Sequence, residues 1–223
     1  MYIAIEGVIG VGKTTLARML QPVFDARVLL EVFEENPFLS DFYGDRARYA
    51  FQTQVFFLLS RCHQQHEAVP AAIRKWPLIS DYTFLKDRLF ARINLSGDEL
   101  DTYDQVHKAL AEKIPLPDLI VYLRADTDVL MQRIALRDRP YERDMEWEYI
   151  DALRQAYDES LNRSSDLPVL TIDSNEIDFV KKRNDLDSII ARIRAAEAGT
   201  YQPELPHLQA ELHKLSEGRL SEQ

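Results

Sequence analysis

Apolar and polar residues follow two different rhythms along this chain. Five short segments are almost continuously apolar, as is typical of buried strands, and they cover residues 2–6, 26–32, 77–81, 116–123 and 167–172. Between them apolar residues recur at the helical period, over residues 13–24, 46–74, 85–94, 97–113, 126–137, 146–163 and 186–198. Strands joined by helical crossovers form parallel sheets. The pattern predicts an α/β fold with a five-stranded parallel sheet and helices on both faces.

The helix expected over residues 46–74 is the longest. Several of its apolar residues keep the 3.6-residue period and share one face, namely Phe51, Val55, Leu58, Leu59 and Cys62. Such a face belongs either to the core or to a subunit interface.

The pattern changes after Gly199, where a segment with two prolines precedes a short amphipathic stretch over residues 208–215. We therefore expect one domain over residues 1–198 and an appended tail over residues 199–223. The tail is expected either to dock on the domain or a partner subunit, or to extend into solvent.

The first apolar segment leads into a glycine-rich turn that fits G-x-x-x-x-G-K-[ST]. Its residues are Gly7, Gly10, Gly12, Lys13, Thr14 and Thr15. The glycines let the backbone curl so that N–H groups point at phosphate oxygens. The lysine is placed to reach the β- and γ-phosphates, the first threonine offers a hydroxyl to Mg²⁺, and the helix directs its positive end at the same anion. The motif predicts a nucleoside triphosphate site.

Two expected strands end in acidic residues, Glu31 and Asp81. Ligands of parallel sheets bind beyond the carboxyl ends of the strands. Carboxylates that face a phosphate site hold Mg²⁺ or accept the proton of an attacking hydroxyl, so both residues are candidates for these roles. The alternatives are a solvated strand end for Glu31 and a helix N-cap for Asp81.

Four arginines gather where the helix expected over residues 126–137 ends, namely Arg133, Arg137, Arg139 and Arg143. Guanidinium groups suit the charge that phosphoryl oxygens carry in a transition state. We therefore expect an arginine-rich lid that closes over the triphosphate and excludes water. The alternative is a solvated helix whose arginines pair with Asp138, Glu142 and Asp144.

Composition narrows the choice of partners. The 223 residues carry a net charge of −10, which argues against a nucleic-acid partner, since phosphate backbones are bound by clustered Lys and Arg. The single cysteine allows no internal disulfide, no leader precedes the first strand, and the longest apolar run is too short to cross a bilayer. We expect a cytoplasmic protein with small-molecule partners and no membrane association.

Several motifs occur in the order found in deoxynucleoside kinases. They are Ile3-Ala-Ile-Glu-Gly-x-Ile-Gly-x-Gly-Lys-Thr-Thr15, Glu31 with Glu35-Asn-Pro-Phe-Leu39, Phe42-Tyr43, Phe51-Gln52-Thr53, Asp81-Tyr82, Asp87, and Arg133-Ile-x-x-Arg137-x-Arg139-Pro. Over residues 2–195 the chain thus resembles the deoxynucleoside kinase family, in particular its bacterial deoxyguanosine and deoxyadenosine kinases. The resemblance implies a P-loop kinase fold, a homodimer, and transfer of the γ-phosphoryl of ATP, with Mg²⁺, to the 5′-hydroxyl of a purine deoxynucleoside for nucleotide salvage.

The resemblance also implies roles for the acceptor-binding residues. Glu31 would be the general base that takes the proton of the 5′-hydroxyl. Tyr43 and Glu142 would hold the 3′-hydroxyl. Gln52 and Asp87 would hydrogen-bond the nucleobase, and the acid at position 87 indicates a purine or cytosine acceptor.

On the donor side, the resemblance places Asp81 near Mg²⁺ and the reacting groups. The cations that act on the phosphates would be Lys13, Arg133, Arg137 and Arg139. The segment over residues 171–179, which includes Asp173, would border the adenine of ATP.

One departure concerns Tyr82. Much of the family has an arginine at this position, where it helps to hold the 5′-hydroxyl and the base carboxylate. Either Tyr82 takes over a weaker form of this role, or another arginine, such as Arg61 from the long helix, reaches the site.

Two other kinds of protein carry a phosphate loop. A nucleoside monophosphate kinase of the thymidylate kinase type also has an arginine lid, but its phosphorylated acceptor would be repelled by Glu31, Glu34 and Glu35. A nucleotide-switched ATPase or GTPase signals by a change of shape, and the Asn-Lys-x-Asp element of guanine-binding switches does not occur in the sequence.

Overall fold

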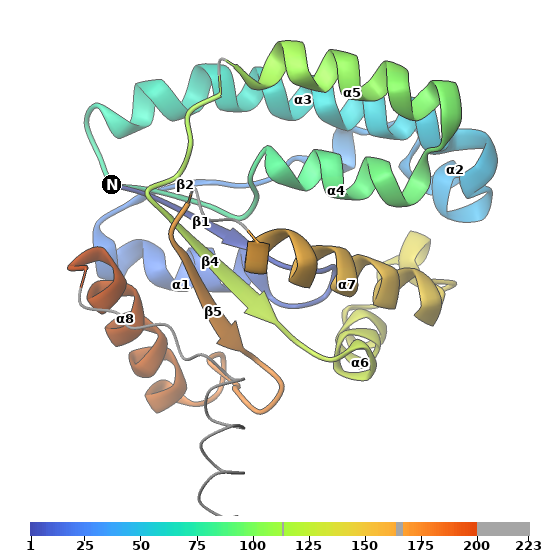
Figure 1. The fold of residues 1–223 in the computed structure, drawn as a ribbon. Helices are drawn as coiled ribbons and strands as arrows, with labels where there is room; N and C mark the ends of the chain where they lie inside the picture. The colour runs from blue at the N-terminus through green and yellow to red at the C-terminus, as the bar shows by residue number, and fades with distance from the viewer. Residues whose placement is uncertain (113, 164–166, 200–223) are drawn as a thin grey trace, which may run out of the picture.

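A computed structural model describes residues 1–112, 114–163 and 167–199 (Figure 1). The strands are β1 (Tyr2–Glu6), β2 (Arg27–Leu29), β3 (Leu78–Ser80), β4 (Leu119–Arg124) and β5 (Val169–Asp173). They form one sheet in the order β2-β3-β1-β4-β5, and each neighbouring pair is parallel. The predicted five-stranded parallel sheet is confirmed.

Helices cover both faces of this sheet, as predicted. They are α1 (Lys13–Phe24), α2 (Leu39–Gly44), α3 (Arg46–Ile73), α4 (Leu85–Asn94), α5 (Gly97–Ala111), α6 (Thr127–Arg137), α7 (Trp147–Arg163) and α8 (Arg183–Glu197), with 3-10 turns at Phe33–Glu35 and Pro140–Glu142. Figure 1 shows α1 and α8 on one face, and α3, α4, α5 and α7 on the other. The strand order explains the split, because right-handed crossovers that run in opposite directions along a sheet lie on opposite faces.

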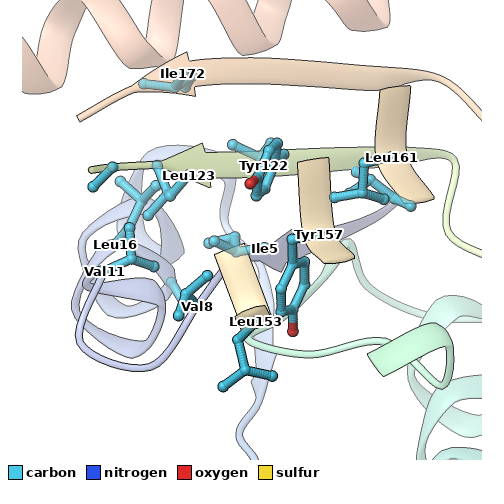
Figure 2. Close-up of a cluster of buried hydrophobic side chains, with 14 of the residues drawn as sticks. Ile5, Val8, Val11, Leu16, Tyr122, Leu123, Leu153, Tyr157, Leu161 and Ile172 are labelled. Carbon is cyan, nitrogen blue, oxygen red and sulfur yellow. The ribbon is translucent and has the colours of Figure 1, made fainter. Parts of the chain in front are cut away.

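The central strands are apolar on both sides, and their side chains form the core with α7. Figure 2 shows Leu153 and Tyr157 of α7 near Ile5 of β1 and Tyr122 of β4. The rings of Tyr122 and Tyr157 stack with their centroids 6.0 Å apart. The hydroxyl of Tyr157 also donates a hydrogen bond to Oε2 of Glu6 at 3.1 Å. The core therefore helps to hold the acid that ends β1, directly before the phosphate loop.

Helices α1 and α4 begin and end where the sequence predicts, whereas four strands, β2, β3, β4 and β5, are shorter than predicted. Strand β2 ends at Leu29, and the backbone N–H of Glu31 binds a carboxylate of Asp81 instead of continuing the sheet. Strand β4 begins at Leu119 because Pro117 has no N–H to donate, and Leu116 is exposed. The short helix α2 was not expected, because six residues are too few to show a helical period.

The long helix α3 carries both core and polar residues on its buried side. Leu58 is fully buried, but Leu59, expected on the same face, is 51% exposed. The buried side also includes polar residues, namely Thr53, Gln54, Arg61 and Gln65. This face therefore does more than fill the core.

None of the helices in the described ranges is long and apolar enough to span a bilayer. The tail expected over residues 199–223 lies outside the described residues, apart from Gly199.

Candidate active site

An open cavity with an empty volume of about 790 Å³ lies beyond the carboxyl ends of β1, β2 and β3. Nine of the predicted site residues line it, namely Gly10, Lys13, Thr14, Glu31, Tyr43, Asp81, Arg137, Arg139 and Glu142. The fold therefore brings together residues that the sequence separates by up to 132 positions.

The phosphate loop has the backbone shape that its glycines predict. Gly7 has φ +145° and Gly12 has φ +105°, values that side chains disfavour. A Cβ on Gly7 would lie 2.5 Å from the carbonyl oxygen of Leu123, and a Cβ on Gly12 would lie 3.1 Å from the ring of Phe179. Only glycine fits this close approach of the loop to its neighbours.

Lys13, the first residue of α1, lies over the loop. Its Nζ donates to the carbonyl oxygens of Gly7 at 2.7 Å and Val8 at 3.1 Å. Burial, followed by the nearby charge of Lys86, lowers the pKa of Lys13 to about 8. A triphosphate in the loop would favour the charged amine, so this lysine is suited to an anionic ligand.

Asp81 connects three parts of the site. Its Oδ2 accepts a hydrogen bond from the hydroxyl of Thr14, and its Oδ1 accepts one from the backbone N–H of Glu31 at 2.8 Å. A hydroxyl and a carboxylate oxygen beside a phosphate loop suit Mg²⁺, which commonly takes one or two protein oxygens together with substrate phosphates. Thr14 and Asp81 therefore fit the metal that the sequence predicts.

Glu31 is largely buried and held by two cations. Nε of Arg61 donates to Oε1 at 2.8 Å, and Nζ of Lys86 donates to Oε2 at 2.6 Å. Burial works to raise the pKa of this carboxyl, but Arg61 and Lys86 outweigh it and hold the pKa well below its ordinary value. The group is thus an ionised carboxylate that lines the cavity above the phosphate loop.

Asp87 lies behind Arg61 and does not line the cavity. It is fully buried and forms an ion pair with the Nη1 of Arg61. Burial raises its pKa to about 6, although Arg61 works against this shift. Arg61 therefore lies between Asp87 and the cavity, whereas the resemblance implies a direct hydrogen bond from Asp87 to the nucleobase.

The question raised by Tyr82 has a clear answer. Tyr82 is fully buried, and its hydroxyl donates to Oε1 of Gln64 rather than to the Glu31 carboxylate. Arg61 reaches Glu31 instead, which is the second of the two alternatives, and Lys86 adds a second cation.

The prediction that Gln52 contacts the nucleobase is wrong in its placement. Gln52 is exposed, whereas Gln54 is buried and lines the cavity. Two residues along a helix are about 200° apart, so the two side chains point to opposite sides of α3. Gln54, Phe57 and Arg61 follow the i, i+3, i+7 spacing of a single face, and this spacing could have identified Gln54.

One wall of the cavity combines Tyr43 with the segment that follows α6. Tyr43 stacks on Tyr141 with ring centroids 6.0 Å apart. Glu142 is buried, accepts a hydrogen bond from Nη2 of Arg137, and lies 3.5 Å from Nη1 of Arg139. These two arginines therefore face the cavity while paired with an acid of their own segment. Arg143 instead pairs with Asp138 at the surface.

Arg133 lies at a second cavity, on the other side of the phosphate loop. This cavity is lined by Gly10, Gly12, Thr15, Arg133 and the residues after β5. Arg133 donates to the hydroxyl of Ser174 at 3.1 Å and to its carbonyl oxygen at 2.6 Å. Asp173 lines neither cavity: it is exposed, and its Oδ1 accepts the backbone N–H of Asn175 at 2.9 Å, which shapes the turn.

Two charged residues were not singled out from the sequence. Lys86 follows Asp81 by five positions, and its role depends on how α4 leaves β3. Glu6 accepts two hydrogen bonds from Thr83, each of 2.6 Å, and burial raises its pKa. Glu6 is a charged residue at the end of an otherwise apolar strand, and this feature of the sequence could have identified it as a site residue.

Known proteins resemble this chain over most of its length. The sequence model of the deoxynucleoside kinase family matches residues 3–196. A deoxyguanosine kinase of Bacillus subtilis is 35% identical over 198 residues, which cover 86% of this chain and 96% of the relative. A deoxyadenosine kinase of Dictyostelium discoideum is 38% identical over 181 residues, or 78% of this chain and 73% of the relative.

Solved structures agree with this comparison. A deoxyadenosine kinase from M. mycoides, solved with the products dCMP and a flexible dCDP, superimposes with a TM-score of 0.76 at 25% identity. The match covers 87% of this chain and 99% of that one. The same enzyme with bound dATP gives a TM-score of 0.75. This protein therefore belongs to the deoxynucleoside kinase family and has the fold of a P-loop kinase, as its sequence predicts.

Proposed function

We propose that the protein transfers the γ-phosphoryl group of ATP to the 5′-hydroxyl of deoxyguanosine or deoxyadenosine, which yields the deoxynucleoside monophosphate for nucleotide salvage. One observation carries the proposal: the carboxylate of Glu31 lines the same cavity as Lys13 and Thr14 of the phosphate loop. A base and a phosphate site within one cavity can hold an alcohol and a triphosphate for direct transfer.

The reaction needs a base and a set of cations. Glu31 takes the proton of the 5′-hydroxyl as that oxygen bonds to the γ-phosphorus, and the bond to the β,γ-bridging oxygen breaks to release ADP. Lys13, Arg137 and Arg139 line this cavity and would stabilise the charge on the phosphoryl oxygens. The two arginines belong to the segment that we propose as a lid.

Thr14 and Asp81 would hold Mg²⁺, which would offset the negative charge of the triphosphate. The proposal is supported by the hydrogen bond between the two side chains, which keeps both oxygens beside the loop.

The nucleobase would be read from α3. Gln54 offers both a donor and an acceptor to the edge of a base, and Arg61 offers further donors while Asp87 holds it from behind. Tyr43 and Glu142 on the facing wall are suited to the 3′-hydroxyl. The names of the relatives favour a purine base.

The second cavity is suited to the adenine of ATP. It adjoins the phosphate loop through Gly12 and Thr15, and Phe179 and Arg133 provide an aromatic ring and a planar guanidinium at its walls. Stacking on such groups is a common way to hold a base.

A nucleoside monophosphate kinase is the nearest alternative. Its acceptor would bring a phosphate dianion to the end of β2, where Glu31 lies in the cavity and Glu34 and Glu35 follow. Both cations near Glu31 are already paired with carboxylates, so an acceptor phosphate would meet repulsion.

The test is a panel of the four natural deoxynucleosides and their monophosphates, assayed with Mg-ATP by ADP release. We expect turnover with deoxyguanosine, deoxyadenosine or both, and a loss of at least ~10²-fold in kcat for Glu31→Gln with ATP binding retained. Faster turnover of the monophosphates, or an unchanged kcat for Glu31→Gln, would overturn the proposal.

The resemblance also supports a cytoplasmic homodimer, and a single cysteine is compatible with a reducing compartment. Light scattering coupled to gel filtration measures the mass directly, and a mass near 25.9 kDa would exclude the dimer.

A further inference from the structure

The ammonium group of Lys86 is placed at the proposed base. Its Nζ lies 2.6 Å from Oε2 of Glu31 and 5.4 Å from the ring centroid of Phe90. The carboxylate of Glu31 is the ion-pair partner that the described residues provide for it. The side chains of Lys86 and Glu31 are 8% and 12% exposed, so water screens this pair little.

This position is electrostatically unfavourable for the fold alone. Lys86 is the second residue of α4, where the positive end of the helix dipole disfavours a cation. The charge of Lys86 also disfavours the charged form of Lys13. A buried lysine at a helix N-terminus beside a second lysine does not serve helix stability, so its role is to be sought in the cavity that it lines.

Arg61, the other cation at Glu31, pairs with two acids. Arg61 binds Oε1 of Glu31 through both Nε and Nη2 and forms an ion pair with Asp87 through Nη1. Arg61 also lines the part of the cavity formed by Gln54, where we place the nucleobase. A base that hydrogen-bonds Arg61 competes with Glu31 for the same guanidinium, whereas the ion pair of Lys86 among the described residues is with Glu31.

We propose that Lys86 is a positioning residue that holds Oε2 of Glu31 and so keeps the carboxylate oriented to accept the 5′-hydroxyl proton while Arg61 engages the nucleobase. The inference rests on the proposed role of Glu31 as the base. It also bears on Tyr82, because Lys86 in the first turn of α4 joins Arg61 in supplying the positive charge that position 82 lacks.

The experiment compares Lys86→Met, Lys86→Arg, Glu31→Gln and the double variant Lys86→Met/Glu31→Gln in the full chain. Lys108→Met serves as a control, because Lys108 is an exposed lysine on the neighbouring helix α5. The assay measures kcat and both KM values with Mg-ATP and deoxyguanosine or deoxyadenosine. Circular dichroism and ATP binding report whether each variant is folded.

We expect Lys86→Met to lower kcat by on the order of 10-fold or more, since small displacements of a catalytic group are costly, and to change the KM for ATP by less than about threefold. Lys86→Arg keeps the charge and should recover most of the loss. In the Glu31→Gln background, Lys86→Met should have almost no further effect, because a residue that acts through Glu31 has nothing left to position.

Two outcomes overturn the inference: an unchanged kcat for Lys86→Met, or an equal loss in the wild-type and Glu31→Gln backgrounds. If Lys86→Met does not fold, Lys86→Gln is measured in the same two backgrounds. If kcat falls in Glu31→Gln but not in Lys86→Met, only the role of Lys86 is rejected. An unchanged kcat for Glu31→Gln rejects the proposed base itself.

Discussion

Oδ1 of Asp81 accepts a hydrogen bond of 2.8 Å from the backbone N–H of Glu31, so the ends of β2 and β3 are joined directly above the phosphate loop. The other oxygen of the same carboxylate accepts the hydroxyl of Thr14, at the start of α1. One side chain thus sets the position of the proposed base relative to the proposed metal and phosphate site. Strand β2 has already ended at Leu29, so this side-chain contact holds Glu31 at a point that the sheet no longer reaches.

The first prediction concerns Asp81→Asn. Asparagine keeps the size of the side chain and one oxygen for the Glu31 N–H, but it removes the negative charge and turns an NH₂ group toward Thr14. We expect the Mg²⁺ concentration for half-maximal activity to rise by at least ~10-fold, with the fold intact. A Mg²⁺ titration at constant ATP measures it. Asp101→Asn, at an exposed site on α5, is the control, and its Mg²⁺ concentration for half-maximal activity should equal that of the wild type. An equal Mg²⁺ requirement in wild type and Asp81→Asn would remove Asp81 from the metal site.

The second prediction separates two glutamines that lie two residues apart on α3. Gln54→Ala leaves the polar edge of the nucleobase unpaired in a buried site and should lower kcat/KM for the deoxynucleoside by about 10- to 100-fold. Gln52→Ala should change it by less than about twofold, because that side chain is exposed. Steady-state kinetics of both variants measure these values of kcat/KM. A larger loss in Gln52→Ala than in Gln54→Ala would restore Gln52 as the residue that contacts the nucleobase.

The two glutamines, Gln52 and Gln54, also show which parts of the site could be predicted from the sequence. The phosphate loop was predicted correctly because its residues are consecutive and its glycines have a local steric cause. Glu31 and Asp81 could be placed in the cavity because parallel strands end at the same edge of a sheet. The side of α3 that faces the cavity could not be judged reliably, because the apolar pattern of this helix is interrupted by the polar residues that serve the site.

Contacts between distant segments were beyond prediction. The ion pair of Arg61 with Asp87 joins α3 to α4, and that of Lys86 with Glu31 joins α4 to the end of β2. Each depends on how two helices cross, which no local spacing in the sequence determines. For the same reason the arginines of α6 were expected to act together, whereas Arg133 and Arg137 lie at different cavities.

The third prediction uses two of these arginines. Arg137→Met removes a guanidinium that lines the cavity and should lower kcat by about 10²-fold, the scale of a lost donor to a developing charge. Arg143→Met removes an arginine that is paired with an exposed Asp138, and we expect a change of less than about twofold. A comparison of kcat between the two variants at saturating substrates tests whether this segment acts as a lid. Equal effects of the two substitutions would favour the alternative of a solvated helix.

The fourth prediction concerns pH and Asp87. The pKa of this buried carboxyl is raised from an ordinary 3.8 to about 6, chiefly by burial, so the folded state binds its proton more tightly than the unfolded state does. The contribution of Asp87 to stability is therefore fully present below about pH 4 and is lost as the pH rises through about 6. Asp87→Asn has no proton to lose, and its amide oxygen can still accept from Arg61.

Urea unfolding of both proteins between about pH 4 and 7 tests this linkage. Relative to Asp87→Asn, the wild type should lose roughly 2 kcal/mol of unfolding free energy across this range, since each pKa unit corresponds to about 1.4 kcal/mol and part of the titration lies below pH 4. The loss should be concentrated where the carboxyl titrates, because ionisation leaves Oδ2 of Asp87 charged, buried and without a hydrogen-bond partner among the described residues. A constant difference between the two proteins over this range would mean that Arg61 neutralises Asp87 completely, and that the carboxylate is ionised throughout.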